Sequence, residues 1–154
     1  MKNIRFLIQA SVIGAIYASL TLLLMPYSYG IMQVRVAEAL TVLPFFTSAA
    51  IPGLFIGCLI SNIMGGYGLL DIVLGSIATL LAAIITYKVK KKILAPLPPV
   101  LLNALIVGGF LSYILGTKLF VTMAWVGLGQ FIACYGLGFP LLRALEKYKE
   151  ILFK

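Results

Sequence analysis

The chain has 154 residues, of which 62% are hydrophobic and only 10% are charged, and its net charge is +8. A soluble domain needs a more polar surface than this composition supplies, whereas a membrane-spanning helix needs about 20 mainly apolar residues. The composition therefore indicates an integral membrane protein with room for five or six spans, and it excludes a catalytic or nucleotide-hydrolysing domain.

The spans are predicted to be helices of a single all-α domain over residues 1–154. Backbone polar groups in lipid need internal partners, and the sequence lacks the alternating segments of an outer-membrane barrel. The cations flank apolar runs, so we expect a lipid bilayer rather than a nucleic-acid partner. Histidine is absent, and no metal site, cofactor or enzyme activity is expected. Cys58 and Cys134 are interpreted as small packing residues.

The first predicted span covers residues 4–25 and is too long for the apolar region of a signal peptide. It carries two rows of small residues at four-residue spacing, Ala10, Gly14 and Ala18 beside Ser11, Ala15 and Ser19. Small side chains let another helix approach closely. The pattern leaves two interpretations open, which are packing inside the bundle and docking of a partner subunit.

Two shorter spans are predicted at residues 34–46 and 49–63, and Asn62 lies near the end of the second. Neither run reaches 20 apolar residues, so each is expected to be tilted or broken. Arg35 and Glu38 lie in the first run, where an ionisable group near the bilayer centre costs on the order of 3 kcal/mol. At i, i+3 spacing they share a helix face, which predicts a mutual ion pair, a ligand site, or both.

Three further spans are predicted at residues 69–87, 100–116 and 120–142. Asp71 opens the first, where the helix dipole favours a carboxylate. A stiff proline loop at residues 96–99 precedes the next span, which carries Asn103 near its start. That position makes Asn103 a poor ligand contact unless the helix begins earlier. The last span carries Trp125 and Gln130 and leads into an amphipathic tail.

The cations also predict the orientation of a multi-pass plasma-membrane protein with both termini in the cytoplasm. This arrangement places ten cations inside, namely Lys2, Arg5, Lys88, Lys90, Lys91, Lys92, Arg143, Lys147, Lys149 and Lys154. Arg35 and Lys118 are left toward the outer face. Glu38, Asp71 and the glycine-rich loop at residues 65–68 then lie where an imported solute would arrive.

The polar residues within the apolar runs suit binding rather than catalysis. A carboxylate such as Glu38 reads a planar heterocycle with adjacent N–H donors through two parallel charge-assisted bonds. Amide side chains can read its carbonyl, and an aromatic ring can stack on it. The predicted ligand site is drawn from Gln33, Arg35, Glu38, Asn62, Tyr67, Asp71, Asn103, Trp125 and Gln130.

Four separated motifs resemble those of the QueT family, at residues 33–44 (QVRVAEALTVLP), 50–57 (AIPGLFIG), 70–76 (LDIVLGS) and 97–104 (LPPVLLNA). Members of this family are substrate-binding S components of energy-coupling factor (ECF) transporters for queuosine precursors. The resemblance implies a six-helix bundle, a transmembrane coupling subunit and two ATPase subunits as partners, and a 7-deazaguanine ligand such as the nitrile or aminomethyl precursor or queuine. It also implies that the row Ala10, Gly14 and Ala18 docks onto the coupling subunit, with glycine where such motifs carry alanine.

With such a ligand, Glu38 is expected to meet the guanine-like edge, Gln130 or Asn62 the carbonyl, and Asp71 a cationic aminomethyl group. ATP hydrolysis in the partners would drive import, so the chain itself is not an enzyme. Two alternatives stay open. One is an S component for another vitamin or nucleobase, and the other is a helical assembly or regulatory subunit without a ligand.

Overall fold

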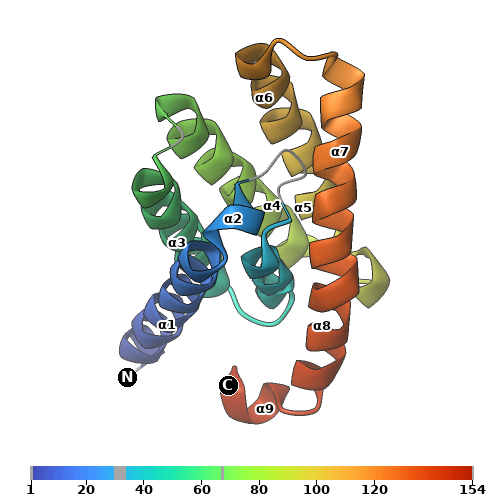
Figure 1. Cartoon of the computed structure of the whole chain (residues 1–154). Coiled ribbons are helices and arrows are strands. Elements are labelled where there is room, and N and C mark those ends of the chain that lie inside the picture. The colour runs from blue at the N-terminus through green and yellow to red at the C-terminus, as the bar shows by residue number, and fades with distance from the viewer. Residues whose placement is uncertain (1, 30–33, 67, 154) are drawn as a thin grey trace.

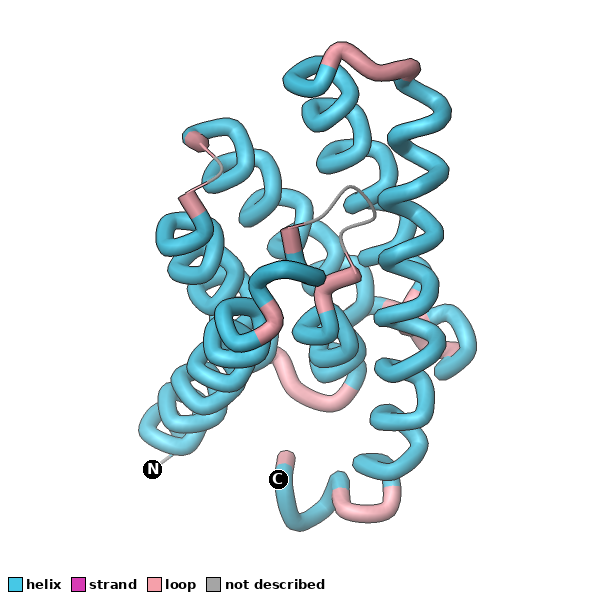
Figure 2. Tube along the Cα trace, in the orientation of Figure 1, coloured by secondary structure: helices cyan, strands magenta, loops and turns pink. Residues whose placement is uncertain are grey.

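The computed structural model describes residues 2–29, 34–66 and 68–153, and every regular element in these ranges is a helix (Figures 1 and 2). The prediction of an all-α protein is therefore confirmed. The elements, in which η marks a 3₁₀ or π segment, are α1 (Lys2–Leu23), α2 (Met25–Ser28), η1 (Val36–Phe45), α3 (Ala50–Gly65), η2 (Asp71–Gly75), α4 (Ser76–Lys88), η3 (Lys92–Leu94), α5 (Leu97–Leu102), η4 (Asn103–Val107), α6 (Gly108–Leu115), α7 (Leu119–Phe131), η5 (Ile132–Gly138), α8 (Phe139–Glu146) and α9 (Lys149–Leu152).

Four helical stretches of the described chain are long and apolar enough to cross a membrane, namely Asn3–Leu23, Asp71–Lys88, Lys92–Leu115 and Leu119–Glu146. Their outward faces carry exposed apolar side chains such as Leu7, Leu105 and Phe120, as expected for contact with lipid. The apolar helices η1 and α3 are shorter. The prediction that residues 34–63 contain no run of full spanning length is confirmed, and four rather than six helices have that length.

The prolines at residues 96–99 begin a helix. Pro98 and Pro99 lie in the first turn of α5, where a missing N–H breaks no intrahelical bond. The predicted stiff loop is therefore wrong, because proline fits the start of a helix as well as it ends one. The fifth predicted span therefore begins earlier than residue 100, and Asn103 lies farther along it than expected.

Helices α1 and α3 pack side by side (Figure 1). A Cβ atom added at Gly53 would lie 2.6 Å from the Ala10 carbonyl oxygen, and one at Gly57 would lie 2.6 Å from the Gly14 carbonyl oxygen. These glycines therefore allow direct contact between the two backbones. Gly14 is buried and Ala18 is only 8% exposed, so much of the predicted docking row packs inside the protein.

Helix η1 is the central element of the bundle, since it contacts α1, α3, α4, α8 and η5. It is a 3₁₀ helix of 10 residues, although such helices rarely exceed four. Seven of its side chains are buried, and Glu38 is one of them. The segment predicted as a short span thus presents its carboxylate to the surrounding helices rather than to lipid.

The start of α1 and helix α9 lie at the same end of the molecule (Figure 1). Gln9 donates a hydrogen bond from Nε2 to the Leu152 carbonyl oxygen at 2.8 Å. At this end Lys92, the first residue of η3, also forms an ion pair with Glu146 at the end of α8. Helix η3 and the C-terminal helices therefore share one end of the bundle.

Candidate functional site

A cluster of buried polar side chains lies among α1, η1, α3, η2, η4 and α7. No member is more than 4% exposed, and the members are Tyr17, Arg35, Glu38, Asn62, Asp71, Asn103 and Gln130. Six of these seven residues belong to the ligand site predicted from the sequence. They are spread over residues 17–130, so only the folded chain brings them together.

The first part of this cluster is centred on Glu38. We call it the Glu38 network, and its members are Tyr17, Glu38, Asn103 and Gln130. The Tyr17 hydroxyl donates a hydrogen bond to Glu38 Oε1 at 2.5 Å. Asn103 Nδ2 donates to Glu38 Oε2 at 3.4 Å and to Gln130 Oε1 at 3.0 Å. Both oxygens of the carboxylate therefore have donors, which hold the side chain in one orientation.

Arg35 pairs with Asp71 and not with its sequence neighbour Glu38. Its backbone is extended (φ −82°, ψ 106°), because the helical geometry begins only at the next residue. Nη2 of Arg35 lies 3.7 Å from Oδ2 of Asp71. The predicted i, i+3 ion pair is therefore wrong, since Arg35 is outside the helix that would have placed both side chains on one face.

Arg35 is held mainly by other groups. Its Nε donates to the Ser28 carbonyl oxygen at 3.3 Å, and its guanidinium lies 4.7 Å from the centre of the Tyr29 ring. Nη1 is 3.9 Å from the sulfur of Cys58. These contacts fix the position of the cation independently of Asp71.

The second part of the cluster, which we call the Asp71 group, consists of Arg35, Asn62, Asp71 and Ser76. Asn62 Nδ2 donates to the backbone carbonyl oxygen of Asp71 at 3.1 Å. Among the described residues, no hydrogen-bond partner is present for Arg35 Nη2, Asn62 Oδ1, either carboxylate oxygen of Asp71, or Ser76 Oγ. Buried polar atoms normally have partners, so this set of open atoms marks a place suited to a bound molecule.

Cys58 adjoins the Asp71 group and does more than fill space. Its sulfur lies 3.3 Å from Thr79 Oγ1 and 3.5 Å from Asn62 Nδ2. The sequence interpretation of Cys58 as a small apolar packing residue is therefore incomplete, because the buried thiol is surrounded by polar groups.

Irregular helix turns carry several of the cluster residues. Asp71 and Asn103 are the first residues of the π segments η2 and η4, and Gln130 is close to the start of a third π segment, η5. A π turn holds one residue more than an α turn and often occurs at functional sites. These turns redirect the side chains that an unbroken α-helix would place elsewhere.

Trp125 is a predicted ligand contact that lies outside the cluster. Trp125 is 45% exposed, whereas its helix neighbours Val126, Gly129 and Gln130 are buried. Trp125 therefore lies on the outward face of α7. Gln33 and Tyr67 are outside the described residues.

The sequence analysis did not name Tyr17 or Tyr29 among the candidate site residues. Tyr17 follows the small residues Gly14 and Ala10 at helical spacing. This spacing could have predicted that Tyr17 lies on the inward face of α1. Tyr29 has no comparable signal, because it follows the short helix α2 in a connecting segment.

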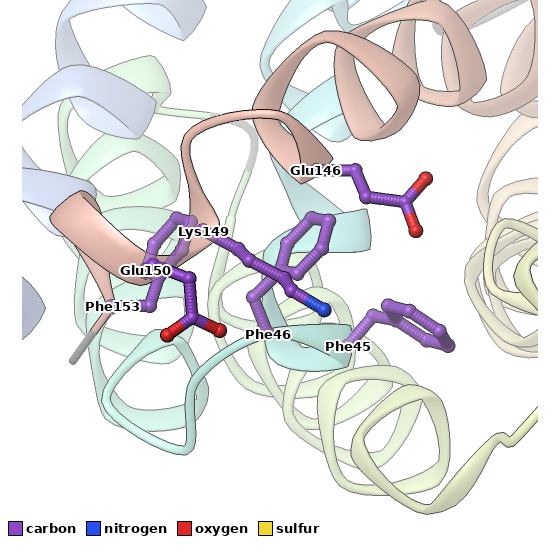
Figure 3. A pocket seen from close by; sticks show the side chains of 6 residues that line it. All are labelled: Phe45, Phe46, Glu146, Lys149, Glu150 and Phe153. Atoms are coloured by element: carbon purple, nitrogen blue, oxygen red, sulfur yellow. The ribbon is translucent and has the colours of Figure 1, made fainter.

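A separate pocket of about 280 Å³ lies at the C-terminal end of the protein (Figure 3). It is lined by Phe45, Phe46, Glu146, Lys149, Glu150 and Phe153. The rings of Phe46 and Phe153 stack with centroids 5.4 Å apart. None of the predicted ligand-site residues lines this pocket, and its aromatic contacts attach the C-terminal segment to the end of η1.

Comparison with known proteins supplies the family. The QueT transporter family profile matches residues 7–147. The chain belongs to the QueT family. The family assignment made from the four sequence motifs is therefore confirmed.

A curated relative of this QueT-family chain is the queuosine precursor transporter QueT of Lactococcus lactis subsp. cremoris (strain MG1363), which is 34% identical over 76 residues. The alignment covers 48% of this chain and 44% of the relative, so it spans less than half of either protein. No solved structure matches. All seven cluster residues lie within the range matched by the QueT family profile.

Proposed function

We propose that this QueT-family protein is the substrate-binding subunit of an ATP-driven ECF importer and that its solute is a queuosine precursor of the 7-deazaguanine class. The family and the name of the Lactococcus lactis relative support the solute class. The buried polar cluster is the observation that carries the binding role. Two carboxylates, a guanidinium and three amides are costly among apolar helices unless they are paired or bind a ligand, and several atoms of this cluster have no partner among the described residues.

Glu38 is the proposed reader of the N–H and amino edge of the deazaguanine ring. Its bond from Asn103 is long at 3.4 Å, so that amide can turn toward a ligand carbonyl with little loss. Gln130 is adjacent to Asn103 and offers a second amide. Tyr17 supplies a hydroxyl and an aromatic face beside the carboxylate, while Gln33 and Tyr67 remain predicted contacts.

The outward face of α1 is the proposed docking surface for the ECF coupling subunit, which would connect this chain to two ATPases. A groove of about 370 Å³ runs between α1 and α3, and its lining includes Ala10, Ser11, Gly14 and Ala15. Ala18 is nearly buried, so the exposed second row extends the surface in its place. We expect Ala15→Leu to abolish co-purification with the coupling subunit while ligand binding persists, and Ala15→Ser to preserve both.

We also propose that both termini are cytoplasmic, as the distribution of cations predicts. The shared position of α9 and the start of α1 at one end of the bundle supports this topology. A solute from outside would then approach from the end where α6 and α7 are joined.

The binding role is tested by thermal unfolding of the detergent-purified protein with deazaguanines, guanine and common transported vitamins. A ligand that binds only the folded state raises its apparent stability, so we expect a rise with deazaguanines. A rise with another vitamin alone would replace the solute. No rise with any compound would favour the ligand-free assembly subunit.

The role of Glu38 is tested with Glu38→Gln, which keeps the shape of the side chain and removes its charge. Loss of charge-assisted bonds in a buried site should weaken binding about 10- to 100-fold. Glu146→Gln is the matched control, because Glu146 lies in the C-terminal segment and pairs with Lys92. Unchanged affinity in Glu38→Gln would refute the proposed reading of the ring.

A further inference from the structure

A second groove in the surface of the bundle lies between α1 and the C-terminal helices α8 and α9. Its volume is about 360 Å³, and every described residue that lines it is apolar except Gln9. The apolar lining includes Ile8, Val12 and Ile16 of α1, Leu40 and Leu43 of η1, and Leu145 of α8. None of these residues lines the groove between α1 and α3 that is proposed for the coupling subunit. The two grooves are therefore separate surfaces of α1.

The polar groups of Gln9 are already occupied. Its Nε2 donates to the Leu152 carbonyl oxygen at 2.8 Å, and its Oε1 accepts a hydrogen bond from Thr47 Oγ1 at 3.2 Å. The buried polar atoms that lack a partner in the described chain all belong to residues outside this groove. The groove therefore offers no polar contact to a solute and is suited to a hydrocarbon.

The groove is also narrow. Ile8 and Ile16 lie eight residues apart on α1, which corresponds to about 12 Å along the helix. A volume of about 360 Å³ over that length gives an average width of about 6 Å. A helix with its side chains is about 10–12 Å wide. The groove therefore excludes a whole helix but accommodates one extended hydrocarbon chain.

Exposed cations lie at the end of the groove where Gln9 contacts Leu152. Arg5 is one helical turn before Gln9 and so lies on the same face of α1. Lys149 lines the pocket that adjoins the groove at Phe153, and Figure 3 shows its side chain beside Phe46. Neither Arg5 nor Lys149 forms an ion pair with a described residue. Both cations are therefore available to a negatively charged group.

The acidic residues of the C-terminal segment do not cancel this charge. Glu146 is paired with Lys92, which leaves Glu150 against the exposed cations Lys147 and Lys149. With Arg5, this end of the groove has a positive net charge. An apolar groove that ends at a positive surface complements a hydrocarbon chain with a negative head group, which is the chemistry of an anionic phospholipid.

We propose that this groove binds one acyl chain of an anionic phospholipid and that Arg5 and Lys149 bind its phosphate group. The proposal goes beyond solute binding and does not depend on which solute the protein carries. In the proposed orientation this end of the bundle meets the cytoplasmic leaflet, whose anionic lipids attract basic segments. A lipid in this position contacts α1, η1 and the C-terminal helices together, so it holds α9 against the start of α1.

The head-group contact is tested by native mass spectrometry of the delipidated full-length protein in detergent, titrated with dioleoylphosphatidylglycerol and dioleoylphosphatidylcholine. These lipids share their acyl chains and differ in the net charge of the head group. We expect one phosphatidylglycerol to bind at least about 10-fold more tightly than phosphatidylcholine, because each nearby cation favours an anionic lipid. The double variant Arg5→Gln/Lys149→Gln should bring the two affinities within about threefold. Lys118→Gln, between α6 and α7 at the other end of the bundle, is the control and should keep the preference.

The groove itself is tested in the same titration with Val12→Trp, which fills it with a larger side chain. We expect this variant to bind both lipids at least about 10-fold more weakly, because the acyl chain loses its place. Leu105→Trp is the matched control. Leu105 is 57% exposed and Val12 is 50% exposed, but Leu105 lies outside the groove. Leu105→Trp should bind both lipids as the wild type does.

Each outcome bears on the proposal. Equal wild-type affinity for the two lipids, or an unchanged preference in the double charge variant, would overturn it. Retention of phosphatidylglycerol by Val12→Trp would also overturn it, and loss of the coupling subunit from that variant would then assign the groove to a partner protein. If Val12→Trp does not fold, the charge variants still decide. Failure to bind deazaguanines would overturn the proposed function and leave the lipid site standing.

Discussion

The two parts of the buried cluster differ in how completely their hydrogen bonds are made. In the Glu38 network, Tyr17 and Asn103 donate to the two oxygens of one carboxylate. In the Asp71 group, both oxygens of the other carboxylate lack hydrogen-bond donors among the described residues. Burial is nearly the same, since Glu38 is 1% exposed and Asp71 is 2% exposed.

This difference shows that burial alone does not define a role. A carboxylate whose bonds are complete is preorganised, and it is ready to exchange one bond for a ligand at small cost. A carboxylate without donors is costly until something binds. The Glu38 network is therefore expected both to stabilise the ligand-free fold and to bind a ligand by exchanging one hydrogen bond, whereas the Asp71 group is expected to gain its missing bonds only when a ligand is present.

The largest expected effect comes from Arg35→Gln, which leaves both carboxylates without their cation. We expect the free energy of unfolding of the ligand-free protein to fall by about 3 kcal/mol, because breaking a buried ion pair strands a charge. Adding Asp71→Asn in the same chain should recover a large part of this loss. A double-mutant cycle measures this coupling between the two residues. Additive losses in the double variant would show that Arg35 and Asp71 are not coupled.

A smaller effect is expected from Tyr17→Phe, which keeps the ring and removes the donor to Glu38 Oε1. The loss of a short bond to a charged acceptor should lower the free energy of unfolding by about 2 kcal/mol. Tyr113→Phe is the matched control, because Tyr113 is 84% exposed. Equal melting temperatures for the two variants would mean that the Glu38 network does not stabilise the fold.

The smallest effect is expected from Asn103→Ala. Its bond to Glu38 is long, and Gln130 can reorient once its neighbour is removed. We expect a loss of about 1 kcal/mol in the free energy of unfolding. A loss greater than that of Tyr17→Phe would place the centre of the Glu38 network at Asn103 instead of at the tyrosine hydroxyl.

Sequence reasoning found most of the cluster residues but misjudged how they pair. Glu38, Asp71, Asn62 and Gln130 stand out because polar groups in apolar runs are costly and rare. The predicted pairing of Arg35 with Glu38 assumed that one helix contains both residues. The helix begins at Val36, one residue after Arg35, so Arg35 is outside it. The sequence does not predict whether Trp125 faces the interior of the bundle or the lipid, because the apolar helix α7 has no polar face that distinguishes the two sides.

The small residues of α1 illustrate the same limit. Their spacing predicts a close contact with another helix, and such a contact exists between α1 and α3. The partner of each row was not predictable, because close packing inside the bundle and docking of a second protein require the same small side chains.

The sequence by itself determined that the chain is a helical membrane protein, which polar groups it keeps among its apolar residues, and to which family it belongs. These properties follow from local composition, periodicity and motifs. Only the tertiary structure decided that Asp71 pairs with Arg35 and that Asn103 reaches Glu38. Those contacts depend on the long 3₁₀ helix, on the π turns and on the backbone contact at Gly53 and Gly57, which the packing of neighbouring helices determines.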